Sequence, residues 1–340
     1  MKQIKIGIIG YGNVGSGLVQ ALIDKGDYYR REIESDFIIT AVVDLHKGCA
    51  YNSQGIPLNE LKNAKMLTDI QNAEHPDWSA INMIHNADTD VIVELSYTDL
   101  KTGEPAALHI QEAILAGKNV VTSNKGPIAL HYKMLSTLAR ENNVKIGIEG
   151  TVMSGTPAIR LGTDLLWPAH ITEINGILNG TTNFILTEME SGSSFNDALK
   201  KAQELGIAEA DPSGDIEGMD TAGKVAILSN LIFGIPIKPD EINRTGITDI
   251  SSEDISAAKK INSRWKLIGS VKKKSDTEVE ACVKPILLPY SNSLANVLGT
   301  TNAIQFTTDF LGQVSLIGPG AGRQETAFAI LEDMIQIYNK

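Results

Sequence analysis

The sequence predicts an α/β protein in which a doubly wound parallel sheet is accompanied by a second domain of α+β type. Apolar, β-branched runs alternate with helical patterns through the first 150 residues, as they do in parallel sheets that are covered by helices on both faces. A glycine-rich turn joins the first run to the first helical pattern. After Gly147 the strand-like runs are separated by long helical stretches. The length of 340 residues suits two domains, since a domain averages about 150 residues.

The first domain is predicted to begin with a strand, a turn and a helix. Residues 4–9 form a β-branched run that ends in the sequence GYGNVG at 10–15, and Leu18, Val19 and Leu22 then recur at helical spacing. A charged stretch over 24–36 follows. Further elements are predicted as buried strands at 37–43, 90–95 and 118–122, and as a helix at 105–115.

The second domain is predicted to be inserted before a final helix. Its strands are expected at 171–178 and 279–288, and its helical regions at about 195–233 and 252–261. A glycine-rich turn at 318–322 precedes a last helix over 326–338, which we expect to pack on the first domain. The predicted domains are therefore residues 1–148 with 319–340, and residues 149–318. The three lysines at 272–274 indicate a solvent-exposed turn.

Charge and composition argue against a nucleic-acid surface. The chain has 41 acidic and 30 basic residues, a formal net charge of −11, and only 5% aromatic residues. Cys49 and Cys282 lack the C-x-x-C spacing of a redox pair or a zinc site. The N-terminus has no signal-peptide pattern, and no apolar run reaches the roughly 18 residues of a membrane span. We therefore expect a cytoplasmic protein that acts on small molecules.

The glycines of the first turn fit a dinucleotide-binding fingerprint of the Rossmann type. Gly10 would permit the tight turn, Gly12 would let the backbone approach a pyrophosphate, and Gly15 would let helix and strand pack closely. Asn13 and Val14 lie where phosphates meet the N–H groups that open the helix. A purely structural glycine turn is the alternative.

Asp44 closes the second predicted strand and bears on the choice of cofactor. Its carboxylate would accept hydrogen bonds from a ribose 2′-OH and repel a 2′-phosphate, which favours NAD over NADP. It lies further along the chain than the usual spacing, a delay that the charged stretch at 24–36 explains. NADP stays open because His46 or Lys47 could turn toward a phosphate, and Asp44 could also be a simple turn residue.

Two lysines are candidates for chemistry. Lys125 lies just past the carboxyl end of the predicted strand 118–122, at the edge where open α/β sheets bind ligands; a surface lysine at a helix start is the alternative. Lys224 is spaced i, i+4 from Asp220 at the head of an apolar helical stripe. Such a stripe faces the protein interior, where charge must be paired or used; an ordinary surface pair is the alternative.

The loop before this helix adds further carboxylates, and a region with several acids and one lysine suits a zwitterionic amino acid. The carboxylates would bind its ammonium group, and Lys224 would meet negative charge that develops on oxygen. These acids are Glu209, Asp211 and Asp215.

In combination these motifs resemble the homoserine dehydrogenases, over almost the whole chain. The resemblance rests on the ordered set GYGNVG at 10–15, VVTSNK at 120–125, GILNGTTN at 176–183, AEADP at 208–212, Asp220, Lys224 and GPGAG at 318–322. It implies NAD(P)-dependent interconversion of L-homoserine and L-aspartate 4-semialdehyde, a step toward threonine, methionine and isoleucine. The alternatives are another semialdehyde or amino-acid dehydrogenase and a non-catalytic nucleotide sensor, and the combination of both lysines with Glu209 and Asp220 argues against each.

The resemblance also implies roles for single residues. Lys224 would donate the proton to the aldehyde oxygen, and Lys125 would bridge substrate and cofactor. In the oxidative direction one lysine must lose its proton, and the sequence leaves open which. The implied substrate-binding acids are Glu209, Asp215 and Asp220. The implied cofactor contacts are Gly10, Gly12, Asn13, Val14, Gly15, Asp44, Ser96, Lys125 and Gly322.

A segment after the first domain resembles one that holds a monovalent cation such as sodium in this family. The implied ligands are the Glu149 carboxylate and the backbone carbonyls of Val152, Ser154 and Thr156, and oxygen ligands suit a hard cation. Met153 and Ser154 depart from the very small residues that are usual there, and an acid at a strand exit is the alternative.

The resemblance finally implies an oligomeric state and a domain composition. The family is generally dimeric through its second domain, so a homodimer is expected. The chain ends shortly after Gly322, which implies the form without a C-terminal regulatory domain and without threonine inhibition through such a domain.

Overall fold

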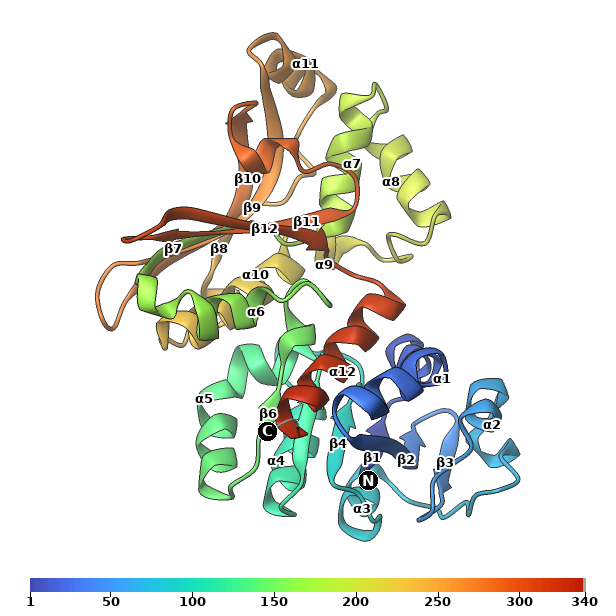
Figure 1. Cartoon of the computed structure of the whole chain (residues 1–340). Helices are drawn as coiled ribbons and strands as arrows, with labels where there is room; N and C mark the ends of the chain where they lie inside the picture. The colour runs from blue at the N-terminus through green and yellow to red at the C-terminus, as the bar shows by residue number, and fades with distance from the viewer. Residues whose placement is uncertain (339–340) are drawn as a thin grey trace. The chain divides into compact units, whose positions relative to one another are not determined.

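The computed structural model describes residues 1–338, which form two compact units (Figure 1). Unit 1 comprises Met1–Gly155 and Gly322–Lys340, and unit 2 comprises Thr156–Ala321. The chain passes from one unit to the other a few residues later than the predicted boundaries at 148 and 318. Within residues 1–338, no helix combines the length and the apolarity needed to cross a membrane.

Unit 1 is built on a six-stranded sheet of order β3-β2-β1-β4-β5-β6. All neighbouring strands are parallel except β2 and β3. The strands are β1 (Lys2–Ile9), β2 (Ser35–Asp44), β3 (Gly48–Tyr51), β4 (Val91–Glu94), β5 (Asn119–Thr122) and β6 (Ile146–Gly147). The helices are α1 (Asn13–Glu32), α2 (Leu58–Asn63), α3 (Ala80–Asn86), α4 (Ala106–Leu115), α5 (Lys125–Glu141) and α12 (Arg323–Tyr338).

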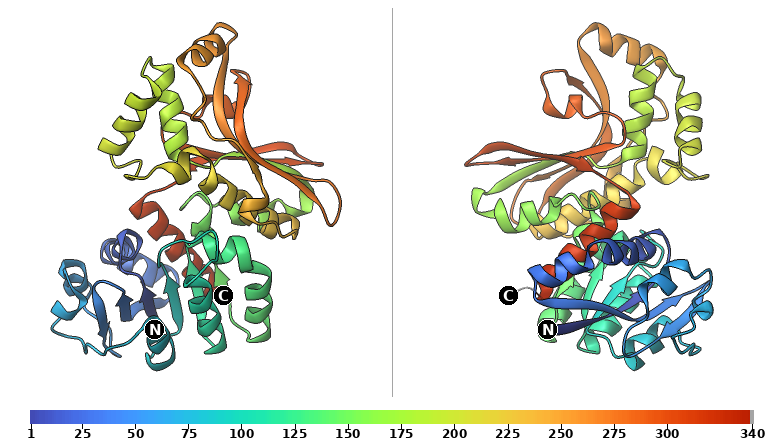
Figure 2. Two further views of the ribbon diagram at one scale, coloured as in Figure 1. Left: turned by 180° about the vertical axis from the view of Figure 1, so that it is seen from behind. Right: turned by 45° about the vertical axis from the view of Figure 1, so that its right-hand side comes forward.

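Helices cover both faces of this sheet, which confirms the predicted doubly wound α/β architecture (Figure 2). On one face, Ile4, Ile6 and Ile8 of β1 belong to a core shared with α1 and α12. On the other face, Ile92 and Val120 belong to a core shared with α3, α4 and α5. Successive side chains of a strand point to opposite faces, so a strand buried on both sides has an almost continuous apolar run.

The charged stretch at 24–36 is mostly the second half of α1. This helix has 20 residues, and its buried side chains, among them Leu18 and Leu22, lie in the first half. The second half has no buried residue and several exposed charges, and Arg30 there contacts Asp27 at 2.8 Å and Asp36 at 3.0 Å. A long helix therefore accounts for the late position of Asp44. The edge strands β3 and β6 and the short helices α2 and α3 were not predicted.

Unit 2 holds a second six-stranded sheet, of order β12-β11-β7-β9-β10-β8, in which only β8 and β10 pair in parallel. The strands are β7 (Ile171–Ile177), β8 (Asn243–Arg244), β9 (Ser263–Lys273), β10 (Val279–Pro289), β11 (Thr301–Thr308) and β12 (Gly312–Pro319). The helices are α6 (Ala158–Arg160), α7 (Gly180–Glu190), α8 (Phe195–Glu204), α9 (Ser213–Ile216), α10 (Met219–Leu228) and α11 (Ser252–Lys260).

Unit 2 departs from the sequence prediction in two ways. The helical region at 195–233 is interrupted between α8 and α9, where Gly206 has a φ of +70° and Pro212 precedes the next helix. The strands β8, β11 and β12 were not predicted, because β8 is very short and polar residues break the apolar runs of β11 and β12. No bounds were predicted for β9. Lys272 and Lys273 belong to β9, so the exposed turn begins at Lys274 rather than at Lys272.

A fully buried lysine ties three segments of unit 2 together. The Nζ of Lys266, in β9, donates hydrogen bonds to Asn183 Oδ1 at 2.8 Å in α7 and to the carbonyl oxygen of Val297 at 2.7 Å before β11. Both acceptors are neutral. Burial lowers the pKa of Lys266 to about 8, because desolvation disfavours the charged ammonium.

Replacing Lys266 by methionine should remove a pH-dependent part of the stability. Between the folded pKa of about 8 and the ordinary 10.5, the unfolded chain binds more protons, so the unfolding free energy of the parent rises with pH in that window. The difference between parent and Lys266→Met should change by roughly 3 kcal/mol across it. Urea unfolding below, within and above the window measures this.

Lys272→Met is the control, because Lys272 lies in the same strand and is 52% exposed. Parallel stability curves for the parent and Lys266→Met would contradict the prediction.

Candidate active site

The three glycines after β1 have different steric surroundings. Gly10 has a φ of +89°, and a Cβ there would lie 2.5 Å from the carbonyl oxygen of Leu95, so no other residue fits. A Cβ on Gly15 would lie 2.9 Å from the Gly10 oxygen, so α1 packs directly on the turn. At Gly12, no atom of the described residues lies within 4 Å of such a Cβ.

The start of α1 is also left open. Gly12 is its N-cap residue and gives no side-chain cap to the N–H groups of the first turn, which Asn13 begins. The open side of Gly12 and these uncapped donors together fit a pyrophosphate, because a helix N-terminus favours negative charge and only a glycine lets the ligand approach the backbone.

Asp44 is fixed against this turn. Its carboxylate accepts hydrogen bonds from the backbone N–H groups of Tyr11 at 2.8 Å, His46 at 2.9 Å and Lys47 at 3.1 Å. Burial acts to raise the pKa of Asp44, but the three donors and the nearby Lys47 ammonium outweigh it and hold the pKa below its ordinary value. Lys47 Nζ itself donates to the Tyr11 carbonyl oxygen at 2.6 Å and lies 5.1 Å from the centre of the Tyr11 ring.

The loops after β4 and β5 meet at the same edge of the sheet. Glu94, fully buried at the end of β4, accepts hydrogen bonds from the N–H and the hydroxyl of Ser96. Asn124 Nδ2 donates to the Ser96 carbonyl oxygen at 3.1 Å, and its Oδ1 caps α5 through the N–H of Gly126. Lys125 is the first residue of α5. A cation at a helix N-terminus opposes the helix dipole, so this position gains from negative charge on a ligand.

Gly322 lies in unit 1 with the glycine turn. Its carbonyl oxygen accepts hydrogen bonds from the N–H and the hydroxyl of Thr326. The next residue, Arg323, contacts the first half of α1, since a Cβ on Gly17 would lie 2.6 Å from the Arg323 carbonyl oxygen. The structure therefore places Gly322 near the start of α1.

In unit 2 the predicted lysine and acid form an ion pair. Lys224 Nζ lies 2.7 Å from Asp220 Oδ2, and the two side chains are only 9% and 17% exposed. Lys224 also donates to the carbonyl oxygen of Leu178, in the segment between β7 and α7. The alternative of an ordinary surface pair is wrong.

Hydrogen bonds through Asn179 connect Asp215 to this ion pair, and Thr181 also binds Asp215. The sequence analysis gave neither Asn179 nor Thr181 a role. Asn179 Nδ2 donates to Asp215 Oδ1 at 2.7 Å and to Asp220 Oδ2 at 3.0 Å, and Thr181 Oγ1 donates to Asp215 Oδ2 at 2.8 Å. Both belong to the GILNGTTN segment. The available signal was the N-cap pattern, an asparagine directly before a helix.

The remaining acids of the loop are not part of this cluster. Glu209 is exposed, and its carboxylate has no hydrogen bond or ion pair to any residue that the structure describes. Asp211 is also exposed, and hydrogen bonds from Ser213 lower its pKa. The structure thus brings Asp215, Asp220 and Lys224 together and leaves Glu209 outside.

The Glu149 segment forms a buried turn. Glu149 is 2% exposed, Val152 is fully buried and Ser154 is 5% exposed. Met153 and Ser154 both have positive φ values, +57° and +53°. In the described part of the chain, no cluster of three or more His, Cys, Asp or Glu residues could hold a metal ion, so a cation here would depend on backbone carbonyls. Thr156 is the first residue of unit 2.

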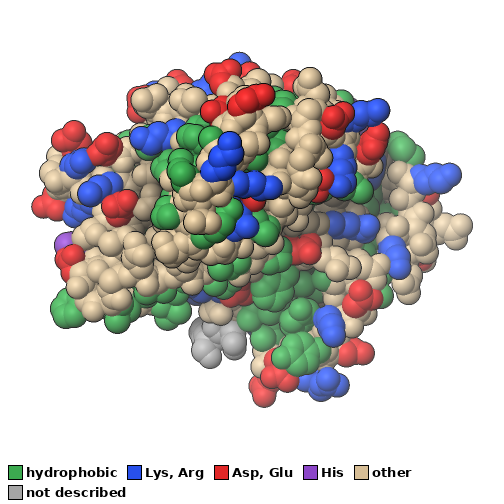
Figure 3. Space-filling view, turned by 90° about the horizontal axis from the view of Figure 1, so that it is seen from above, with side chains coloured by type: hydrophobic (Ala, Val, Ile, Leu, Met, Phe, Trp, Pro, Cys, Tyr) green, Lys and Arg blue, Asp and Glu red, His purple; other side chains and the backbone are tan. Residues whose placement is uncertain are grey.

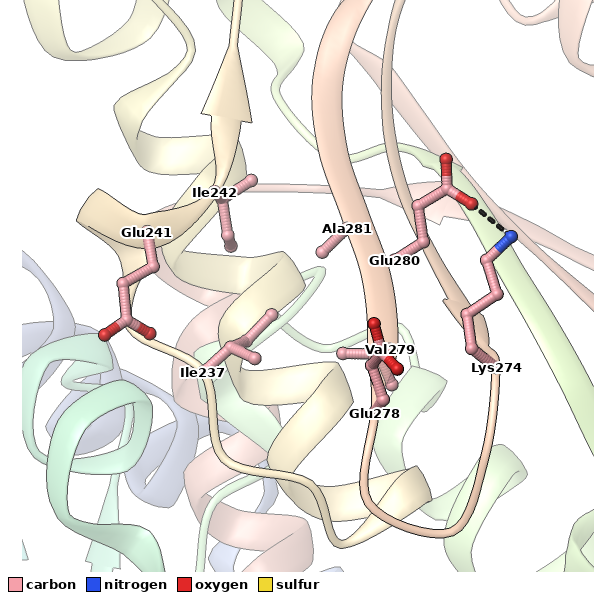
Figure 4. Close-up of a pocket in the computed structure, with 8 residues that line it drawn as sticks. All are labelled: Ile237, Glu241, Ile242, Lys274, Glu278, Val279, Glu280 and Ala281. Carbon is pink, nitrogen blue, oxygen red and sulfur yellow. Dashed lines mark ion pairs between the residues drawn. The ribbon is translucent and has the colours of Figure 1, made fainter.

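Unit 2 also has a pocket of about 390 Å³ that contains none of the predicted site residues (Figure 4). An ion pair between Lys274 and Glu280 lies at its rim. The lining residues are Ile237, Glu241, Ile242, Lys274, Glu278, Val279, Glu280 and Ala281.

Comparison with known proteins identifies relatives along nearly the whole chain. Residues 10–149 match the family model described as "Homoserine dehydrogenase, NAD binding domain", and residues 157–335 match "Homoserine dehydrogenase". An NAD(+)-dependent homoserine dehydrogenase of Pseudomonas canavaninivorans is 41% identical over 99% of this chain and 97% of its own length.

Two solved structures are similar in fold as well as in sequence. A putative homoserine dehydrogenase of Archaeoglobus fulgidus has a TM-score of 0.89 and 37% identity, covering 99% of this chain and 100% of that one. A hyperthermophilic archaeal homoserine dehydrogenase in complex with NADPH has a TM-score of 0.84 and 32% identity, covering 98% and 97%. The chain therefore belongs to the homoserine dehydrogenase family, whose reaction is the NAD(P)-dependent interconversion of L-homoserine and L-aspartate 4-semialdehyde.

Proposed function

We propose that Lys224 exchanges a proton with the substrate oxygen in this reaction and that Lys125 bridges substrate and cofactor. The observation that carries the proposal is the buried ion pair of Lys224 with Asp220. Desolvating two charges is costly, and a buried ammonium is placed to interact with negative charge that develops on a substrate oxygen. For Lys125 the support is its place just past the carboxyl end of β5, directly after Asn124, which donates to the Ser96 carbonyl oxygen.

The ammonium group and the reacting oxygen of the substrate then each have a chemical partner in the chain. The acids Asp215, Asp220 and Glu209 suit the ammonium group of the amino acid, and the exposed Glu209 carboxylate is available to it. When bound, NAD(P) supplies or accepts the hydride at the substrate carbon. Lys224 stabilises the negative charge on the aldehyde oxygen and gives it a proton, a role that a positioned acid performs well in a site shielded from water.

Replacing Lys224 by methionine should lower kcat for L-homoserine oxidation by about 10²- to 10⁴-fold, the usual contribution of a positioned acid or base. The KM for the cofactor should stay unchanged, because the glycine turn lies in unit 1. Absorbance of the reduced cofactor follows the reaction.

Lys201→Met is the matched control, since Lys201 is an exposed lysine of unit 2 that pairs with Glu188. A kcat of Lys224→Met within a few-fold of the parent value would remove Lys224 from the mechanism.

We infer that NAD is preferred over NADP. The Asp44 carboxylate is held beside the glycine turn, and its pKa is lowered, so it is ionised at neutral pH and would repel a 2′-phosphate. The Lys47 ammonium is engaged by the Tyr11 carbonyl oxygen and ring, which leaves it less available to that phosphate. The name of the Pseudomonas relative agrees with this preference, and the NADPH complex of the archaeal relative makes it worth testing.

Asp44→Asn keeps the shape of the side chain and removes its charge. The ratio of kcat/KM with NAD to kcat/KM with NADP should fall by about tenfold or more, since one close charge contact is worth about 1.4 kcal/mol or more. Asp36→Asn, in the same strand but paired with Arg30, should leave the ratio unchanged. An unaltered ratio in Asp44→Asn would refute the role of Asp44.

We further propose that the Glu149 segment binds a monovalent cation such as sodium, through the Glu149 carboxylate and the carbonyls of Val152, Ser154 and Thr156. The support is the burial of Glu149 and the two successive positive φ values at Met153 and Ser154, which turn the backbone a few residues further along the chain. Hard oxygen ligands suit such an ion.

We also infer that the protein is cytoplasmic, a compartment in which the free thiols of Cys49 and Cys282 would stay reduced.

We infer in addition that two copies of the chain form a homodimer through unit 2. The support for the dimer is an apolar patch beside β12, which is an edge strand of its sheet. Backbone contact joins Asp309 to Ala169, so the two parts of the patch are neighbours. The patch consists of Leu165, Trp167, Phe310, Leu311 and Ile317, which are 55–81% exposed. Figure 3 shows hydrophobic side chains among the charged ones on one face of the molecule.

Charge placed in this patch should separate the subunits. Phe310→Asp should shift the mass measured by light scattering from that of two chains to that of one, because an edge strand with exposed apolar side chains is stabilised by pairing. Leu205→Asp, at an exposed leucine of unit 2 outside the patch, should leave the mass unchanged. A parent protein with the mass of a single chain would contradict the proposal.

A further inference from the structure

The side chain of Asn179 uses all its hydrogen-bonding groups, and uses them for two separate tasks. Its Oδ1 accepts from the N–H of Thr182 at 2.9 Å and so caps α7. Its Nδ2 donates to Asp215 Oδ1 and Asp220 Oδ2. Asn179 is only 5% exposed, so water does not readily replace either set of bonds.

The second task places one neutral donor between two acids. Two carboxylates that lie close together repel each other. An amide nitrogen that gives one hydrogen to each of them offsets this repulsion without adding a charge. Thr181 holds the other oxygen of Asp215 and Lys224 shares Asp220 Oδ2, so the amide links the acid of α9 to the ion pair of α10.

We infer that Asn179 is a positioning residue of the reaction, which fixes the distance between Asp215 and Asp220 and thereby the place of the Lys224 ammonium. The inference rests on the proposed roles of these three residues. The contacts of Asn179 are with the two carboxylates and the start of α7. It acts through the carboxylates, in the way that supporting hydrogen bonds hold a catalytic group in its productive geometry.

The capping task can be kept while the bridging task is removed. Asparagine, aspartate and serine are about equally good at an N-cap position. Asn179→Ser keeps an oxygen for the Thr182 N–H and loses both donors to the acids. Asn179→Asp also keeps the cap oxygen and adds a third carboxylate. A residue that served only as a cap would tolerate Asn179→Ser.

The experiment is the kinetics of L-homoserine oxidation by the full-length parent and these two variants. We expect kcat/KM to decrease by about 10- to 100-fold in Asn179→Ser, the effect of losing hydrogen bonds to charged groups, and further in Asn179→Asp. KM for L-homoserine should rise and KM for the cofactor should not. Asn292→Ser is the control, because Asn292 is also an N-cap, of the turn at Ser293–Asn296.

Circular dichroism and melting temperature verify that each variant is folded. A second measurement does not depend on full stability: in an Asp215→Asn background, the loss caused by Asn179→Ser should shrink, because contacting residues are not additive. Equal kcat/KM in the parent, Asn179→Ser and Asn179→Asp would overturn the inference and leave Asn179 as a cap. Full activity of Lys224→Met would instead refute the proposed roles, so the two failures are distinguishable.

Discussion

The buried ion pair of Lys224 and Asp220 is the constraint on which the arrangement of unit 2 depends. Removing one member of such a pair leaves an uncompensated charge and typically costs about 3–5 kcal/mol. The two charges have further hydrogen-bond partners in the segment between β7 and α7. The Leu178 carbonyl oxygen accepts from Lys224, and the Asn179 amide donates to Asp220. The same contacts that make the charges tolerable hold α10 against the start of α7, so stability and the geometry of the site have a common origin.

Local signals in the sequence were sufficient for most of unit 1. The strand β1, the glycine turn and α1 follow one another without a break, and the buried parallel strands have almost continuous apolar runs. In unit 2 the signals are weaker, because β11 has buried polar residues such as Asn302 and Gln305, and β9 contains the fully buried Lys266. A lysine inside a strand interrupts the apolar pattern from which that strand would be predicted.

In the candidate site, too, contacts between residues close in sequence could be predicted, and contacts between residues far apart in sequence could not. Asp220 and Lys224 are one helical turn apart, so their pairing follows from their spacing. The contact of Asn179 with Asp215 joins residues that are 36 positions apart, and no periodicity encodes it. The sequence correctly placed the glycines of the turn at a strand–helix junction. Only the structure shows that neighbouring backbone atoms leave no room for a side chain at Gly10 and Gly15, while Gly12 faces open space.

The order of the segments along the chain also has a consequence for biosynthesis. The last helix, α12, supplies Ile330, Leu331 and Met334 to the core that α1 and β1 share, yet all of unit 2 is translated before it. Nascent domains generally fold as they emerge from the ribosome. The apolar surface that α12 covers in the folded protein therefore stays uncovered until the last part of the chain is synthesised.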